Sequence, residues 1–140
     1  MQVLVAHDGS PQAGKALEEA ARIASKFSGG ITIVTVAPDV CMGSEELSPE
    51  ECSLVARSLS AEAEARARKA AQSLKAKGIE AQVLVRAGRP PEQIVEAARE
   101  TGADLIVIGS VGRHGAARLL LGSVSSRVAE LADVNVLIVK

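Results

Sequence analysis

Five short runs of apolar residues, separated by helical patterns, constrain the fold of this chain more than any other feature. The runs read VLVAH (3–7), ITIVTVA (31–37), AQVLVRA (81–87), DLIVIGS (104–110) and VNVLIVK (134–140). Continuous apolar runs of this kind are typical of strands whose two faces are both buried in a parallel sheet. Because parallel strands need right-handed crossovers, the alternation predicts an α/β fold with helices on both faces of a doubly wound sheet.

Helix start and stop residues lie between these runs and predict four helices. Ser10 can act as an N-cap with Pro11 at the first helical position, and apolar residues then recur at spacings of three and four as far as Phe27. Ser48 and Glu51 form a capping box at the start of the second helix. The predicted helices span about 11–28, 49–77, 90–101 and 123–132.

Length, charge and residue usage limit the classes of function. The 140 residues predict one domain, 1–140, and a net charge of -1 argues against a nucleic-acid partner. No run approaches the roughly 18 apolar residues of a spanning helix, and the first residues lack a signal-peptide pattern, so we expect no membrane partner and a cytoplasmic location. Cys41 and Cys52 lack metal-ligand spacing and are predicted to be ordinary thiols. Phe27 is the only aromatic residue, which predicts an aliphatic core without a stacking platform for bases or flavins.

Residues 9–15 nearly spell a phosphate-binding P-loop, with Gly9, Gly14 and Lys15 at the right spacing. A P-loop needs Ser or Thr after the lysine and a turn that stays non-helical so that consecutive N–H groups face the phosphates. Here Ala16 follows the lysine, and Pro11 has no N–H and begins a predicted helix. We therefore expect Gly14 and a solvent-facing Lys15 inside that helix, and no P-loop.

A stronger candidate site follows the fourth apolar run, in GSVGRHGAARLLLGSVSS (109–126). Gly109 and Gly112 allow the backbone to approach a ligand closely, and Gly122 with Ser123 opens the last helix, whose free N–H groups favour an anion. Each of these residues also has a purely structural interpretation, as the end of a strand, a turn or a helix cap. Together they lie where open parallel sheets bind ligands, provided that the first and fourth strands are neighbours.

The spacing of these residues resembles the nucleotide-binding motif of the universal stress protein family, G-x2-G-x9-G-S. The resemblance covers essentially the whole chain, including DGS after the first strand and LLLGSVSSRV before the last. It implies a Rossmann-like, adenine nucleotide alpha hydrolase-like sheet of five parallel strands in the order 3-2-1-4-5. It also implies ATP as ligand, with Mg²⁺ held through the phosphates, and a homodimer through the last strand at Val136, Leu137, Ile138 and Val139.

The same resemblance assigns roles to individual residues. Asp8 would face the ribose or the adenine, although it could also be a buried or capping carboxylate, and the backbone at Val36 would meet the adenine edge. The residues implied beside the ribose and phosphates are Gly109, Ser110, Gly112, Gly122, Ser123, Val124 and Ser125. Arg113 and Arg118 are either phosphate partners or solvent-facing. His7 and His114 have no evident nucleophile or metal partner and are predicted to be structural.

The predicted function is nucleotide-dependent regulation or stress response. Two alternatives stay open, a slow ATP hydrolase and a nucleotide-free interaction scaffold. The sequence offers no evident general base or metal cluster for efficient hydrolysis, so we expect a weak ATPase at most. A response-regulator receiver would need an acidic residue at the end of the third strand, and a flavodoxin would need aromatic residues on its flavin; both are disfavoured.

Overall fold

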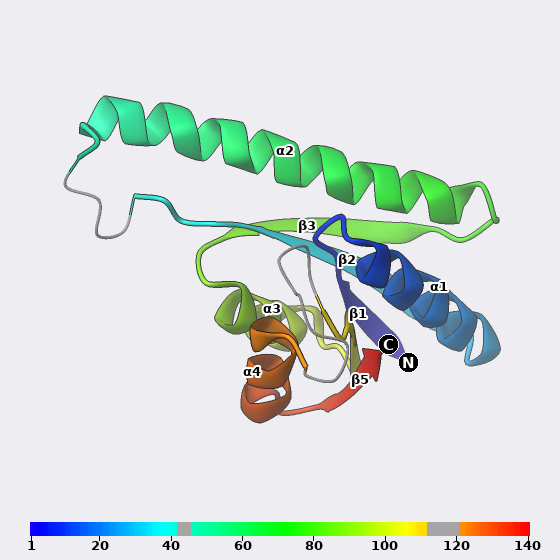
Figure 1. Cartoon of the computed structure of the whole chain (residues 1–140). Coiled ribbons are helices and arrows are strands. Elements are labelled where there is room, and N and C mark those ends of the chain that lie inside the picture. Colours follow the sequence, from blue (N-terminus) through cyan, green and yellow to red (C-terminus); the bar gives the residue numbers. More distant parts are fainter. Residues whose placement is uncertain (42–45, 112–120) are drawn as a thin grey trace.

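Strands and helices alternate along the chain in the computed structural model, which describes residues 1–41, 46–111 and 121–140 (Figure 1). The elements are β1 (Gln2–Ala6), α1 (Pro11–Lys26), β2 (Gly30–Ala37), α2 (Pro49–Lys75), β3 (Ala81–Ala87), α3 (Pro90–Thr101), β4 (Leu105–Gly109), α4 (Ser123–Leu131) and β5 (Asn135–Val139). The helix starts predicted at Pro11, Pro49, Pro90 and Ser123 are confirmed. Gly14 lies inside α1, so the P-loop is excluded, as expected.

The strands form one parallel sheet in the order β3-β2-β1-β4-β5, which confirms the predicted fold class. β1 lies at the centre and pairs with β4 from Val3 opposite Leu105 onward. After β1 the chain crosses to the face that α1 covers, whereas the connection after β4 leads to α4 on the opposite face. The two connections therefore diverge at the carboxyl ends of β1 and β4, which makes this point the topological switch of the sheet.

Two aliphatic cores fill the space between the sheet and its helices. α1 and α2 pack on one face around Val3, Val5 and Ile33, while α3 and α4 pack on the other around Leu4 and Ile106. These five side chains are at most 1% exposed, as expected for strands covered on both faces.

Phe27 does not join either core, and the prediction that placed it on the apolar face of the first helix is wrong. α1 ends at Lys26, and Phe27 is the C-cap residue, with its side chain 62% exposed. Because the backbone leaves the helix at this residue, the helical spacing no longer directs the ring toward the sheet. The chain's one aromatic ring is therefore a surface group.

α2 is anchored to the sheet by its second half alone. Its buried residues are Ala63, Ala67, Ala70 and Leu74, whereas none of the side chains of residues 49–59 is buried. We call residues 49–59 the projecting segment; it extends past the end of the sheet (Figure 1). Although α2 has 27 residues, neither it nor any other described helix is apolar enough along its length to cross a membrane.

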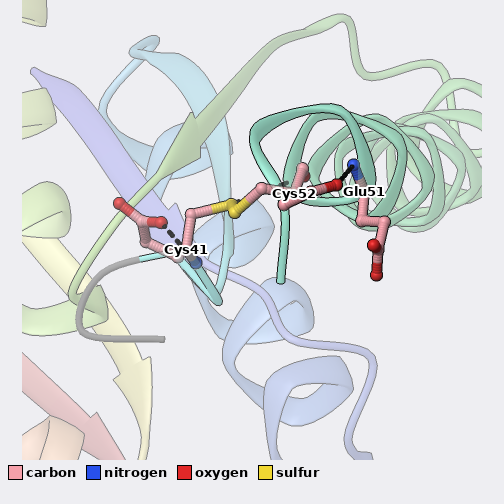
Figure 2. The surroundings of a disulfide bond; sticks show 5 residues. Cys41, Glu51 and Cys52 are labelled. Carbon is pink, nitrogen blue, oxygen red and sulfur yellow. Dashed lines mark hydrogen bonds between the residues drawn. A yellow bond between two sulfur atoms is a disulfide. The ribbon is translucent and has the colours of Figure 1, made fainter. Parts of the chain in front are cut away.

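Cys41 and Cys52 form a disulfide, so the prediction of two ordinary thiols is wrong (Figure 2). Their Cα atoms lie 5.6 Å apart, within the range of about 4.4–6.8 Å that a disulfide requires. The long α2 brings its first turns back over the end of β2, and this tertiary arrangement has no signature in the spacing of the two cysteines. The bond joins the connection that follows β2 to the projecting segment.

Candidate functional site

A cavity of about 420 Å³ opens at the topological switch, between the carboxyl ends of β1 and β4. Its floor and walls are mostly aliphatic, with Val34 and Val36 from β2, Ile94 from α3 and Ile108 from β4. Among its lining residues, the polar side chains come from two places, the β1–α1 turn and the start of α4. An apolar cleft with a few convergent polar groups is the usual form of a small-molecule site.

The β1–α1 turn supplies His7, Asp8 and Ser10 to the cavity wall. The Oδ1 atom of Asp8 accepts the Ser10 N–H at 2.9 Å, and Ser10 Oγ in turn accepts the Ala13 N–H at 3.1 Å. Gly9 has a φ of 86°, a left-handed conformation that favours glycine. Asp8 therefore holds the turn in shape while it lines the cavity, so its structural and its ligand-facing interpretations are both compatible with the fold.

The start of α4 closes the opposite side of the cavity. The Gly122 N–H donates to the Ser110 carbonyl at 2.7 Å, and the Ser125 hydroxyl lies 3.0 Å from the same oxygen. Gly122 is the N-cap residue, and no described side chain caps the helix. The N–H groups of Ser123 and Val124 are in the first turn, where a helix offers no internal acceptors and the dipole favours negative charge. This end of the cavity can bind an anion.

The whole chain, residues 1–140, matches the model of the universal stress protein family. The chain belongs to this family. A curated relative, universal stress protein YxiE of Bacillus subtilis, is 31% identical over 145 residues, which cover 99% of this chain and 98% of the relative. The family assignment and the strand order confirm the family and the fold that the resemblance implied.

Solved universal stress protein structures share the architecture. UspA from Lactobacillus plantarum superposes with a TM-score of 0.86 at 27% identity, covering 100% of this chain and 97% of that one. Another universal stress protein, crystallised in complex with cAMP, gives a TM-score of 0.64 at 30% identity, covering 100% and 97% of the two chains. A structural relative of this chain thus binds an adenine nucleotide.

Most of the residues predicted for the site line this one cavity of the universal stress protein fold. They are Asp8, Val36, Gly109, Gly122, Ser123, Val124 and Ser125. Ser110 is buried beside the cavity, and its carbonyl oxygen orients Gly122 and Ser125. Gly112, Arg113, His114 and Arg118 lie outside the described residues. Whether any of these residues contacts a ligand stays a prediction.

Sequence reasoning missed several of the cavity's walls. Pro38, Pro90 and Ile94 also line it. The sequence pattern marks Pro90 only as a helix start, and Ile94 lies one turn further along α3. One signal could have found Pro90 and Ile94: a helix that begins directly after an edge strand starts at the carboxyl side of the sheet, where its first turn faces the switch point.

The protonation of His7 is expected to make the stability of this protein depend on pH. Its Nδ1 accepts the Gly9 N–H at 3.2 Å, and burial lowers the pKa of the ring below 6.5, with Asp8 opposing and Arg66 reinforcing that shift. The unfolded chain therefore gains a proton at His7 before the folded chain does. We expect the free energy of unfolding to fall as pH drops below 6.5 and to level off below the folded pKa.

Urea unfolding followed by circular dichroism between about pH 5 and 8 would measure this effect. His7→Gln keeps a side-chain acceptor for Gly9 and removes the titration, so its unfolding free energy should vary less over the same interval. An identical pH dependence in the two chains would show that His7 is not the titrating group.

Proposed function

We propose that this chain is an ATP-binding universal stress protein. In this proposal the bound nucleotide changes its conformation or assembly, and the protein so acts in nucleotide-dependent regulation or stress response. The observation that carries the proposal is the position of the cavity, which runs from the aliphatic wall of β2 and α3 to the start of α4, where no described side chain caps the helix. An adenine suits the aliphatic end, and phosphates suit the helix start. The cAMP complex of a related structure supports an adenine nucleotide as the ligand class.

In this proposal the backbone at Val36 meets the adenine edge, Asp8 faces the ribose, and the phosphates lie against residues Gly122 to Ser125. Within the described residues no group of three or more His, Cys, Asp and Glu side chains is placed to hold a metal. Mg²⁺ would therefore be held mainly through the phosphates, with the exposed Ser123 hydroxyl as one side-chain oxygen that could join it in the described part of the cavity. It would neutralise phosphate charge there.

Two measurements test ATP binding. The purified protein is first denatured, and the released small molecules are identified by mass spectrometry; the stripped protein is then titrated with ATP and Mg²⁺ by calorimetry. We expect co-purified adenine nucleotide or binding in the micromolar range. An absence of binding at millimolar ATP would refute the proposal and leave the nucleotide-free scaffold as the better interpretation.

We also propose a homodimer that forms through β5. This strand is at the edge of the sheet, and Val136, Leu137, Ile138 and Val139 remain only half-buried in the single chain. An exposed apolar edge strand favours pairing with a second chain. Sedimentation equilibrium should give twice the chain mass of 14.4 kDa, and a monomer at micromolar concentration would refute this. A cytoplasmic location stays a prediction from the sequence.

A further inference from the structure

The Cys41–Cys52 disulfide joins a segment that directly follows a strand of the sheet to a helical segment that has no side chain buried against the sheet. Cys41 follows Pro38, a residue of the cavity wall, in the connection after β2. Cys52 lies in the projecting segment of α2 (Figure 2). The bond is thus a covalent tie between the carboxyl end of the central sheet and a helical segment that lies beyond it.

Local hydrogen bonds place both cysteines independently of the bond between them. The Cys41 N–H donates to Oδ1 of Asp39 at 3.1 Å, and the Cys52 N–H donates to the Ser48 carbonyl at 2.9 Å. The Ser48 hydroxyl also accepts the Glu51 N–H at 3.1 Å, which fixes the first turn of α2. Because these local bonds do not involve sulfur, each turn can form again after the disulfide has been opened, and the buried residues of the second half of α2 keep its start in the neighbourhood of Cys41.

The second half of α2 is held on the sheet by packing that does not involve this bond. The second half of α2 is held by Ala63, Ala67, Ala70 and Leu74, which are at most 5% exposed. In the projecting segment, by contrast, Leu54 is 65% exposed and Val55 is 37% exposed. Short helical segments without buried side chains are marginal in water, so a tether has its largest effect on such a segment.

We propose that Cys41–Cys52 is a redox-exchange site whose co-substrate is a dithiol, and that its oxidation state sets the order of the projecting segment. Both cysteines are only half-buried, so a thiolate can approach the bond. The thiolate attacks Sγ of Cys41, a mixed disulfide forms, and the electron pair of the broken bond leaves on Sγ of Cys52.

The second thiol of the reductant then attacks the reductant's sulfur atom in the mixed disulfide. This step releases Cys41 as a thiolate. The reductant ends as a disulfide, and each cysteine ends as a thiol after taking up one proton, so two electrons and two protons are transferred in total. In the disulfide state Sγ of Cys41 lies 3.4 Å from the Cys52 carbonyl oxygen. In the reduced chain the Cys41 thiol can donate to that oxygen whenever the first turns of α2 are formed, and the two sulfur atoms are then close enough for reoxidation.

Hydrogen exchange measured by mass spectrometry on the full-length protein tests this proposal. The oxidised protein, the protein reduced with dithiothreitol, and the protein reoxidised with oxidised glutathione are compared after bound nucleotide has been stripped from all three. We expect exchange in peptides from residues 49–59 to rise at least about tenfold on reduction and to return on reoxidation. Peptides from residues 63–75 should change by less than about twofold. No nucleotide is involved, so the outcome is independent of ATP binding.

The matched control is the double variant Cys41→Ser with Cys52→Ser, which should exchange like the reduced protein and be insensitive to dithiothreitol. Thiol titration of the native protein before and after reduction should show two thiols appearing. If dithiothreitol did not reduce the Cys41–Cys52 bond under native conditions, the proposal that this bond is a redox-exchange site would be refuted. Unchanged exchange in residues 49–59, or a rise that extends through residues 63–75, would overturn the local role of the bond.

Discussion

Gly122→Val is expected to weaken ATP binding by roughly 100-fold, or about 2.8 kcal/mol, while the chain keeps its fold. The φ of Gly122 is -63°, which any residue can adopt, so the backbone need not change. An added Cβ would lie 3.1 Å from the Ser110 carbonyl oxygen and 3.7 Å from Ser125 Oγ. Because protein atoms already crowd that Cβ, we expect the two further methyl groups of valine to extend into the cavity, where we place the phosphates.

Gly122→Ala is the matched control for this substitution. It introduces the same tight contact with the Ser110 oxygen but not the two additional methyl groups. Calorimetric titration of both chains with ATP and Mg²⁺ should show a much larger loss for Gly122→Val, with both chains folded by circular dichroism. If Gly122→Val bound ATP as tightly as the unchanged protein, the phosphates would not lie at the start of α4.

Gly109→Ala is expected to lower the free energy of unfolding by about 1–3 kcal/mol. A Cβ at this position would lie 2.9 Å from both the backbone carbonyl carbon and the Cβ of Gln12, in the first turn of α1. Backbone atoms cannot move aside as the end of a flexible side chain can, so α1 or β4 must shift. The closeness of α1 to the end of β4 therefore requires glycine here, whether or not a ligand is bound.

Gly14→Ala provides a control of opposite sign. Gly14 lies within α1, and no described atom beyond the neighbouring residues and the local helix backbone lies within 4 Å of the Cβ that the substitution would add. Replacing glycine in a helix interior should raise the unfolding free energy by about 0.5–1 kcal/mol. Urea unfolding of both variants measures the two effects, and a stability of Gly109→Ala equal to that of the unchanged protein would show that the contact with Gln12 relaxes freely.

The features that could be predicted from sequence are those that depend on neighbouring residues. Each strand had its apolar run, although most side chains are buried only in β1, β2 and β4 and not in the edge strands β3 and β5. Ser10, Ser48 and Pro90 mark helix starts because capping involves only a few consecutive residues. The strand order came from the family resemblance, whose motif positions Gly109 and Gly122 meet at the cavity.

The features that could not be predicted depend on tertiary distances. The disulfide requires α2 to bring Cys52 within reach of Cys41, and that approach is fixed by the packing of Ala63 to Leu74 on the sheet. The role of Gly109 shows the same limit: its sequence context suits a ligand contact and a packing contact equally. In the structure Gly109 both lines the cavity and touches α1.

The aliphatic composition of the two cores gives this protein an unusual optical property. With no Trp or Tyr and with Phe27 as its one aromatic residue, the polypeptide is almost transparent in the near ultraviolet. An adenine ring absorbs strongly there, so a nucleotide carried through purification would dominate the absorption spectrum of the sample. A plain spectrum of the purified protein, taken before and after denaturation and filtration, would therefore report the occupancy of the cavity directly.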